Sequence, residues 1–269
     1  MSFLSFLRKS KNVSVIPLNG IIAPNMGRRK GLNLNEIDKN IEQAFSVKNL
    51  KAVALQINSP GGSPVQSEMI SQRIRSLSEK NNVPVLAFIE DVAASGGYWL
   101  ACSADEIFAS KASIVGSIGV VSSGFGFDKA IQKIGVERRL YTSGENKAIL
   151  DPFLPENNDD VKKLKSIQKE LHNQFIAFVK SRRGSKISVE NKEVFTGTFW
   201  SGEKSLEIGL IDSFGEMKSV LKQRFGENVK IREFAPKKKL FGFGNLLSGA
   251  LDILLQKIYE KNILQRFGL

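Results

Sequence analysis

The serine at position 95 is the side chain in this sequence whose surroundings best suit a nucleophile. It lies in residues 91–98, which read DVAASGGY, so small residues flank the hydroxyl and a substrate could approach the backbone closely. Glycine permits turns that other residues resist, and a helix beginning at Ser95 would direct free N–H groups at a developing oxyanion. An isolated AASGG sequence also fits a serine that only caps a helix, so both interpretations stay open at this point.

A second glycine-rich turn, NSPGG, follows a buried apolar run at residues 58–62. Such a turn can present backbone N–H groups at the carboxyl end of a parallel sheet, where it could supply half of an oxyanion hole. An ordinary turn is the alternative. A phosphate-binding loop fits less well, because the lysine of a Walker-type loop is missing.

The elements that must position these turns alternate between strand and helix. Apolar patterning predicts strands at residues 13–18, 52–57, 84–89 and 137–141, and helices at 34–45, 65–80, after Ser95, at 127–134 and at 159–180. The long last helix is amphipathic, with one face formed by Val161, Leu164, Ile167, Leu171 and Phe175. This alternation predicts an α/β fold with a parallel sheet and flanking helices.

The composition narrows the classes of function. The chain has 39 basic and 27 acidic residues, a net charge of +12, which favours acidic partners such as anionic lipid headgroups. No base-stacking motif accompanies the basic clusters, so we predict no nucleic-acid binding. The single cysteine, Cys102, excludes an intramolecular disulfide and is predicted to be a small core residue. With one cysteine and one histidine, neither a metal nor another cofactor is predicted.

Several motifs in a shared order resemble the SppA-like signal peptide peptidases, relatives of Clp protease and crotonase. The resemblance spans about residues 13–212 and rests on NSPGG (58–62), DVAASGGY (91–98), VGSIGV (115–120), YTSGENK (141–147), TGTFWSG (196–202) and IGLID (208–212). It implies a Clp/crotonase-type fold. It further implies that Ser95 is the nucleophile, Lys147 the general base and Ser117 the serine that orients the lysine. The family's oxyanion-hole amides fall on Gly62 and Gly96.

A serine–lysine pair is chemically coherent, because a neutral lysine can remove the proton of a serine. A free lysine titrates near about 10.4, so Lys147 is expected to be desolvated or close to another cation. A carboxylate close to the Lys147 amine would keep it protonated, so we expect the side chain of Glu145 to point away from Lys147. A solvated loop lysine is the ordinary alternative for Lys147. Any Ser-His-Asp triad would need the only histidine, His172, which we predict to be a helix-surface residue.

The resemblance implies a serine endopeptidase that cleaves remnant signal peptides or other short, apolar, unfolded segments through an acyl-enzyme. It also implies a homo-oligomer, in which neighbouring subunits complete the substrate grooves. Two rival functions stay open: a crotonase-like acyl-CoA enzyme, and a catalytically silent, membrane-associated assembly scaffold.

The sequence suggests three segments: a basic N-terminal segment (1–12), a peptidase domain (13–236) and a basic C-terminal appendage (237–269). The appendage can form an amphipathic helix with an apolar face of Leu247, Leu251, Leu254, Ile258 and Tyr259. This face could bind an anionic membrane, or pack against its own domain or a neighbouring subunit. No signal peptide or spanning helix is predicted, so the chain is expected on the cytoplasmic side, peripheral to the membrane.

Overall fold

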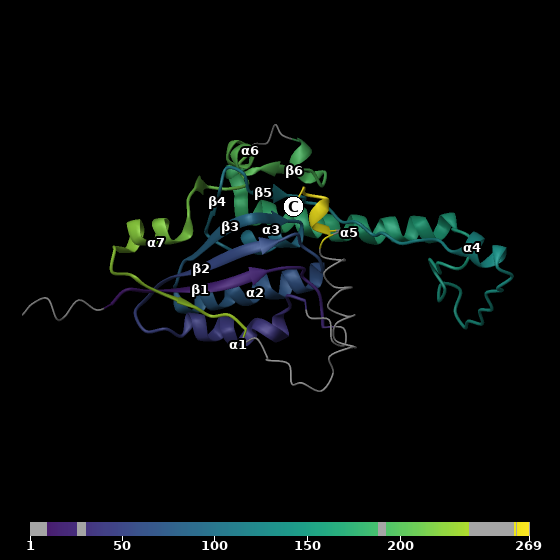
Figure 1. The fold of residues 1–269 in the computed structure, drawn as a ribbon, viewed down its shortest axis with the longest axis horizontal. Coiled ribbons are helices and arrows are strands. Elements are labelled where there is room, and N and C mark those ends of the chain that lie inside the picture. Colours follow the sequence, from purple (N-terminus) through teal and green to yellow (C-terminus); the bar gives the residue numbers. More distant parts are fainter. Residues whose placement is uncertain (1–9, 26–30, 188–191, 237–260, 262, 269) are drawn as a thin grey trace, which may run out of the picture. The chain divides into compact units, whose positions relative to one another are not determined.

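A computed structural model describes residues 10–25, 31–187, 192–236, 261 and 263–268 of the protein (Figure 1). The chain divides into two compact units. Met1–Ile118 and Ile176–Leu269 form one, here called the sheet unit, and Gly119–Phe175 forms the other, the inserted unit. The predicted amphipathic face of the C-terminal appendage lies outside the described residues.

The described strands form one eight-stranded sheet, in the sheet unit. Their bounds are β1 (Asn12–Asn19), β2 (Leu50–Ser59), β3 (Val85–Ala94), β4 (Glu106–Ala109), β5 (Ile114–Gly116), β6 (Phe199–Ser201), β7 (Ser213–Phe214) and β8 (Lys230–Glu233). The order is β6-β5-β3-β2-β1-β8, with β4 pairing β3 and β7. Only the β5–β6 pair is antiparallel. The predicted α/β fold with a parallel sheet is therefore confirmed.

Helices follow the strands along the chain, as the periodicity predicts. The described α-helices are α1 (Leu34–Phe45), α2 (Pro64–Asn81), α3 (Gly96–Ala101), α4 (Asp128–Lys133), α5 (Asn158–Arg183), α6 (Gly202–Glu207) and α7 (Met217–Phe225). Two 3-10 turns, η2 (Gly184–Lys186) and η3 (Lys192–Phe195), follow α5. The starts of α1 and α2 are fixed locally, because the side chains of Asn33 and Ser63 accept hydrogen bonds from the first turn of each helix. Pro64 then suits the first position of α2, where no N–H is needed.

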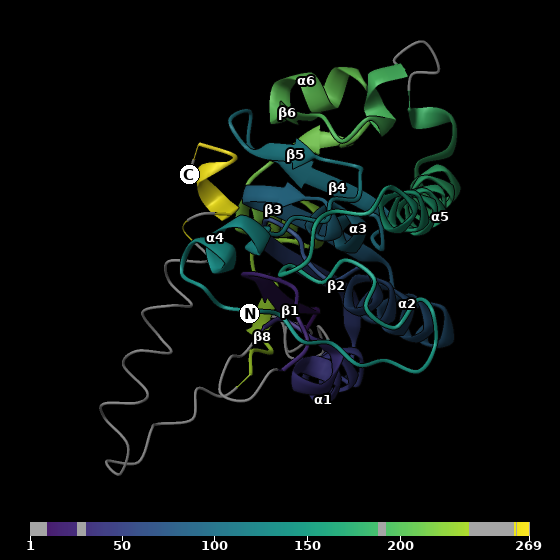
Figure 2. The same ribbon diagram turned by 90° about the vertical axis from the view of Figure 1, so that its right-hand side faces the viewer.

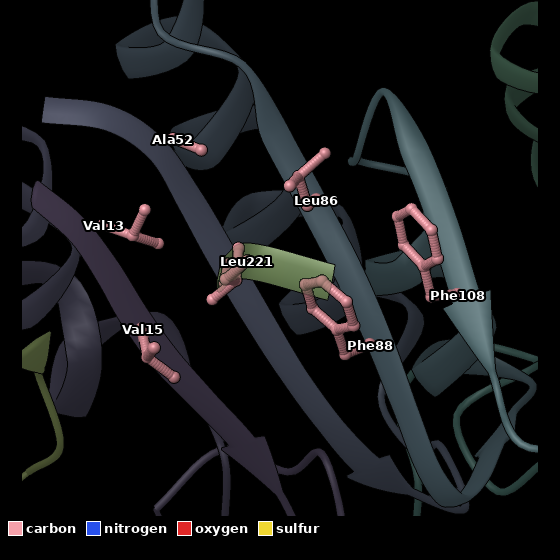
Figure 3. Close-up of a cluster of buried hydrophobic side chains, with 8 residues drawn as sticks. Val13, Val15, Ala52, Leu86, Phe88, Phe108 and Leu221 are labelled. Atoms are coloured by element: carbon pink, nitrogen blue, oxygen red, sulfur yellow. The ribbon is translucent and has the colours of Figure 1, made fainter. Parts of the chain in front are cut away.

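Both faces of the sheet are covered by helices. Figure 2 shows α1, α2 and α3 on one side of β1, β2 and β3. The other face carries a cluster of buried apolar side chains, in which Leu221 of α7 packs against residues of β1 to β4 (Figure 3). The cluster consists of Val13, Val15, Ala52, Ala54, Leu86, Phe88, Phe108 and Leu221. Burial of such side chains stabilises each by about 1.5–3 kcal/mol relative to exposure, so this packing fixes the strands that lead to the site.

Strand β3 continues beyond the predicted residue 89 and changes neighbours as it does so. Its first half pairs with β4 and its last three residues, Val92 to Ala94, pair with β5. Between these two pairings, the Oγ of Ser113 donates a hydrogen bond to the carbonyl oxygen of Glu90 on β3 at 2.5 Å. The strand therefore ends directly before Ser95.

The strand predicted at residues 137–141 is wrong, since this segment has no regular structure. Its charged residues pair locally instead: Arg138 binds Asp151 at 2.8 Å, and Arg139 binds Glu137 at 3.1 Å. No described strand lies in the inserted unit to accept its backbone hydrogen bonds. The predicted helix α5 is confirmed, but of its predicted apolar face only Phe175 is buried, and Ile167 is 45% exposed.

A buried ion pair connects the end of α5 with the segment after α6. Arg183 donates to Asp212 at 2.8 Å and twice to the carbonyl oxygen of Gly209, and its side chain is 2% exposed. Partial burial alone would raise the pKa of Asp212, but hydrogen bonds from Arg183 and Lys186 outweigh it and lower the pKa. Cys102 is buried as predicted, and burial raises the pKa of its thiol to about 12, so the thiol stays protonated.

Arg183→Met is expected to lower the free energy of unfolding by about 3 kcal/mol, because it removes the buried partner of Asp212, which keeps only Lys186, and leaves the Gly209 carbonyl without its two donors. Arg139→Met, at the surface pair, is the control and should change it little. Since the pKa of Asp212 is depressed in the folded state, its contribution is present above about pH 4 and is lost as the pH falls through the folded value. Urea unfolding at pH 7 and at pH 3 measures both effects. Equal losses in the two variants at pH 7 would contradict this role.

Candidate active site

Ser95 lies in a strained turn between β3 and α3. Its backbone has φ 52° and ψ −121°, a region that non-glycine residues rarely occupy, and such strain concentrates at functional sites. The turn is held by the Ser95 N–H, which donates to the carbonyl oxygen of Gly116 on β5 at 2.8 Å. The side chain makes no capping hydrogen bond to α3. The interpretation of Ser95 as a helix cap is therefore not supported.

Glycines allow the neighbouring backbone to approach this turn closely. A Cβ on Gly61 would lie 2.7 Å from the carbonyl oxygen of Ala94 and 2.8 Å from the Cβ of Ser95. A Cβ on Gly97 would lie 2.4 Å from the carbonyl oxygen of Ser59. Real Cβ atoms do not approach so closely, so the NSPGG turn and the start of α3 pack together only because these residues are glycines.

Gly62 and Gly96 lie close together at this contact. The Gly62 nitrogen lies 3.3 Å from the position that a Cβ on Gly96 would take. Gly62 itself lies against Ile22, flanked by hydrogen bonds from Ile22 N to Gly61 O and from Ser63 N to Ile22 O. Among the described residues the Gly62 N–H has no hydrogen-bond acceptor. Gly96 is the first residue of α3, where the backbone N–H groups have no acceptor within the helix. Two free amides beside a serine can stabilise an oxyanion.

Ser117 follows β5, one residue after the carbonyl that binds the Ser95 amide. It too has a positive φ, 55°, and its N–H donates to the carbonyl oxygen of Thr198 at 2.8 Å. Residues Gly62, Ser95, Gly96 and Ser117 thus come together in the sheet unit from β2, β3, α3 and β5.

Lys147 lies in the inserted unit, in a turn after Gly144. Its side chain is exposed, so its own unit does not provide the desolvation that a lysine base needs. Neither Lys147 nor Glu145 takes part in an ion pair among the described residues. The turn is tied to α5, because the Leu150 N–H donates to the carboxylate of Asp160 at 3.0 Å. His172 lies on α5 and is half-buried rather than fully on the surface.

Phe199 is an aromatic residue on β6, the strand next to β5, and its sequence motif alone predicts no role for it. It pairs with Gly116 across the β5–β6 ladder, and its side chain is 40% exposed. Its ring packs edge-on against Phe267, with centroids 5.1 Å apart. The TGTFWSG motif contains two adjacent aromatic residues, but only the structure shows that Phe199 is the more exposed of the two.

Solved structures with a similar fold are peptidases. The chain matches a mutant of the 1510-N membrane-bound stomatin-specific protease with a TM-score of 0.52 and 19% identity, covering 85% of this chain and 100% of that one. A second mutant of that protease, in complex with a substrate peptide, matches with a TM-score of 0.52 and 17% identity. The fold of this chain is thus similar to that of this protease.

Sequence comparison identifies the family. The model for peptidase family S49 matches residues 78–230, more than half of the chain, and the chain belongs to that family. Protease 4 of Haemophilus influenzae is 31% identical over 76% of this chain and 32% of its own length. The chloroplastic serine protease SPPA of Arabidopsis thaliana is 32% identical over 67% of this chain and 26% of its own.

A protein named Na(+)/H(+) antiporter NhaA, from Brucella abortus, is more similar, at 47% identity over 86% of this chain. The match covers only 31% of that longer protein. The chain therefore spans between about a quarter and a third of the length of these three relatives. Of the helices that the structure describes, none combines the length and apolar character needed to cross a bilayer.

Proposed function

We propose that this protein is a serine endopeptidase that hydrolyses peptide bonds in short apolar or unfolded peptides, such as remnant signal peptides. The observation that carries the proposal is the strained turn at Ser95, whose hydroxyl makes no capping bond and whose backbone packs against the glycine turn of Gly61 and Gly62. Membership in peptidase family S49 and the names of several relatives support it. The exposed ring of Phe199, next to Gly116, supports an apolar substrate.

In the proposed reaction, Ser95 Oγ attacks the carbonyl carbon of the scissile bond while neutral Lys147 Nζ takes its proton. The oxyanion accepts hydrogen bonds from the amides of Gly62 and Gly96. Lys147 returns the proton to the leaving amine as the C–N bond breaks, which leaves an acyl ester on Ser95. Lys147 then deprotonates a water that attacks the ester, and as the ester C–O bond breaks, the lysine returns the proton to Ser95 Oγ, which releases the acid and restores Ser95. Ser117 orients the lysine.

Labelling with a fluorophosphonate tests this function against its rivals. The full chain should react at Ser95, and Ser95→Ala should not. The chain should also hydrolyse a fluorogenic apolar peptide. Turnover of an acyl-CoA without labelling would favour the crotonase-like enzyme. Absence of labelling, peptide hydrolysis and acyl-CoA turnover would favour the silent scaffold.

We further propose that the protein acts as a homo-oligomer. Residues 119–174 contain no buried residue, and large apolar side chains are exposed there, among them Phe125 at 82% and Tyr141 at 91%. Monomers rarely leave so much apolar surface in water. A second copy that covered this surface could also desolvate Lys147, in line with the shared substrate grooves that the family resemblance implies.

Light scattering should therefore report several subunits for the full chain. Phe125→Glu and Ile134→Glu, which put a charge into the exposed apolar surface, should dissociate the oligomer and reduce peptide hydrolysis. Met69→Glu changes an exposed apolar residue of α2 and is the matched control, expected to leave the mass unchanged. A monomeric full chain with full activity at nanomolar concentration would refute the proposal.

Peripheral membrane contact through residues 237–269 is also a proposal, based on their basic and amphipathic sequence. Where this segment is described, Phe267 packs against Phe199 of the same chain, which favours docking on its own domain at that point. Co-sedimentation with anionic vesicles at low salt distinguishes the two. A full chain that stays in the supernatant would exclude the membrane contact.

A further inference from the structure

Ser67 of α2 contacts both of the backbone segments that carry the proposed oxyanion amides. Its Oγ donates a 2.9 Å hydrogen bond to the carbonyl oxygen of Ser63, the residue that follows Gly62. The Ser67 N–H donates to the same oxygen at 3.1 Å. The Oγ also lies 2.4 Å from the position that a Cβ on Gly96 would take. One fully buried hydroxyl thus contacts the segment of Gly62 and packs against Gly96.

Ile22 also contacts both segments, through backbone hydrogen bonds on either side of Gly62 and through its Cδ1, 3.2 Å from the position of a Cβ on Gly96, but the Oγ of Ser67 lies closer to that position. Gly62 belongs to the turn after β2, whereas Gly96 opens α3 after β3, so separate elements must bring them together. Donors of an oxyanion hole act when they lie about 2.7–3.1 Å from the oxyanion. A misplacement of about 1 Å can reduce a rate about 100-fold. The group that sets the spacing of these amides therefore bears directly on the rate.

We propose that Ser67 is a positioning residue for the oxyanion hole, and that its hydroxyl sets the distance between the amides of Gly62 and Gly96. The proposal rests on the proposed peptidase function and assigns a role to a residue outside the serine–lysine pair. Ser67 touches neither the substrate nor the reacting atoms. It acts only through the two glycines.

Ser71 provides a matched control on the same helix. It lies one turn further along α2 and is equally buried, but its Oγ has no hydrogen-bond partner in the described part of the chain. Removing this hydroxyl deletes the same atom from the same kind of environment without touching either glycine. A purely structural role of buried serines in α2 would make the two positions respond alike.

The experiment compares Ser67→Ala, Ser67→Val, Ser71→Ala and Ser71→Val in the full chain. Ser67→Ala removes the bond to Ser63 and opens space beside Gly96, and Ser67→Val places a methyl group where only the hydroxyl fits. We expect kcat for a fluorogenic peptide to fall about 10-fold in Ser67→Ala and about 100-fold in Ser67→Val, with KM within about twofold of wild type. A peptide aldehyde forms a tetrahedral adduct whose oxygen occupies the hole, so it should bind more weakly by similar factors. Both Ser71 variants should keep kcat and aldehyde binding within about twofold of wild type.

The outcomes separate this inference from the function on which it rests. If Ser67→Ala matches Ser71→Ala in kcat and aldehyde binding, the positioning role is wrong, even if both lower the melting temperature. A change in KM alone also overturns it. If Ser67→Val fails to fold, Ser67→Ala still decides. A wild-type chain that neither reacts with a fluorophosphonate nor cleaves peptides overturns the proposed function, and the role of Ser67 with it.

Discussion

Ser95→Ala and Lys147→Ala are each expected to lower kcat for peptide hydrolysis by at least about 1,000-fold, with the fold intact. The reason is that Ser95 attacks the peptide only when Lys147 takes its proton. Without Ser95 there is no nucleophile, and without Lys147 the hydroxyl keeps its proton. Residues that act as one unit are not additive, so the double variant should be no worse than either single one. Hydrolysis of a fluorogenic peptide by each variant, with circular dichroism to check folding, measures this.

Two further variants show whether the loss is specific to the pair. Lys133→Ala removes an exposed lysine of the same unit and should retain activity. His172→Ala should also retain most of it, because the proposed mechanism gives the histidine no role. Full activity in Lys147→Ala would refute the serine–lysine pair, and a loss in His172→Ala as deep as that in Ser95→Ala would indicate a histidine triad instead.

Gly62→Ala should reduce kcat by about 100-fold or more, the loss typical of one missing oxyanion donor. The added Cβ would lie 2.0 Å from the carbonyl oxygen of Ile22, and the φ of +144° is one that alanine rarely adopts. The backbone must therefore move, and the amide moves with it. Gly124→Ala is the control, because nothing lies within 4 Å of its added Cβ.

Single-turnover acylation by a fluorophosphonate reports this effect directly. The labelling rate should fall in Gly62→Ala and stay unchanged in Gly124→Ala. The labelling rate should also fall in Gly96→Ala, because the added Cβ would clash with the Oγ of Ser67. Wild-type labelling in a folded Gly62→Ala variant would show that this amide does not hold the oxyanion.

Most of the helices and the central strands could be predicted from the sequence because their signals are local. Helix α1 matches the predicted 34–45, and its capping residue, Asn33, lies beside it in the chain. The same holds for α2, where Ser63 and Pro64 mark the start. The apolar runs that become β1 and β2 are buried on both faces, as continuous apolar patterning indicates.

The strand predicted at 137–141 failed for the opposite reason. A strand requires a partner for its backbone N–H and C=O groups, and the local sequence carries no information on whether one is present. Arg138 and Arg139 find acidic partners close by instead, and the segment stays irregular. The second half of β3 was not predicted for the same reason. Its strand partner is β5, about twenty residues further along the chain, which the local sequence does not reveal.

The sequence by itself determined which residue types are available for chemistry: a serine among small residues, two glycine-rich turns, a loop lysine and an order of motifs that resembles one peptidase family. Only the tertiary structure decided that the Ser95 hydroxyl does not cap α3, that the Gly62 nitrogen lies close to Gly96, and that the Oγ of Ser67 packs against Gly96. The physical reason is that these features arise from contacts between separate elements. The Ser95 turn is held by a hydrogen bond to β5, and the two glycine turns approach because no side chain stands between them.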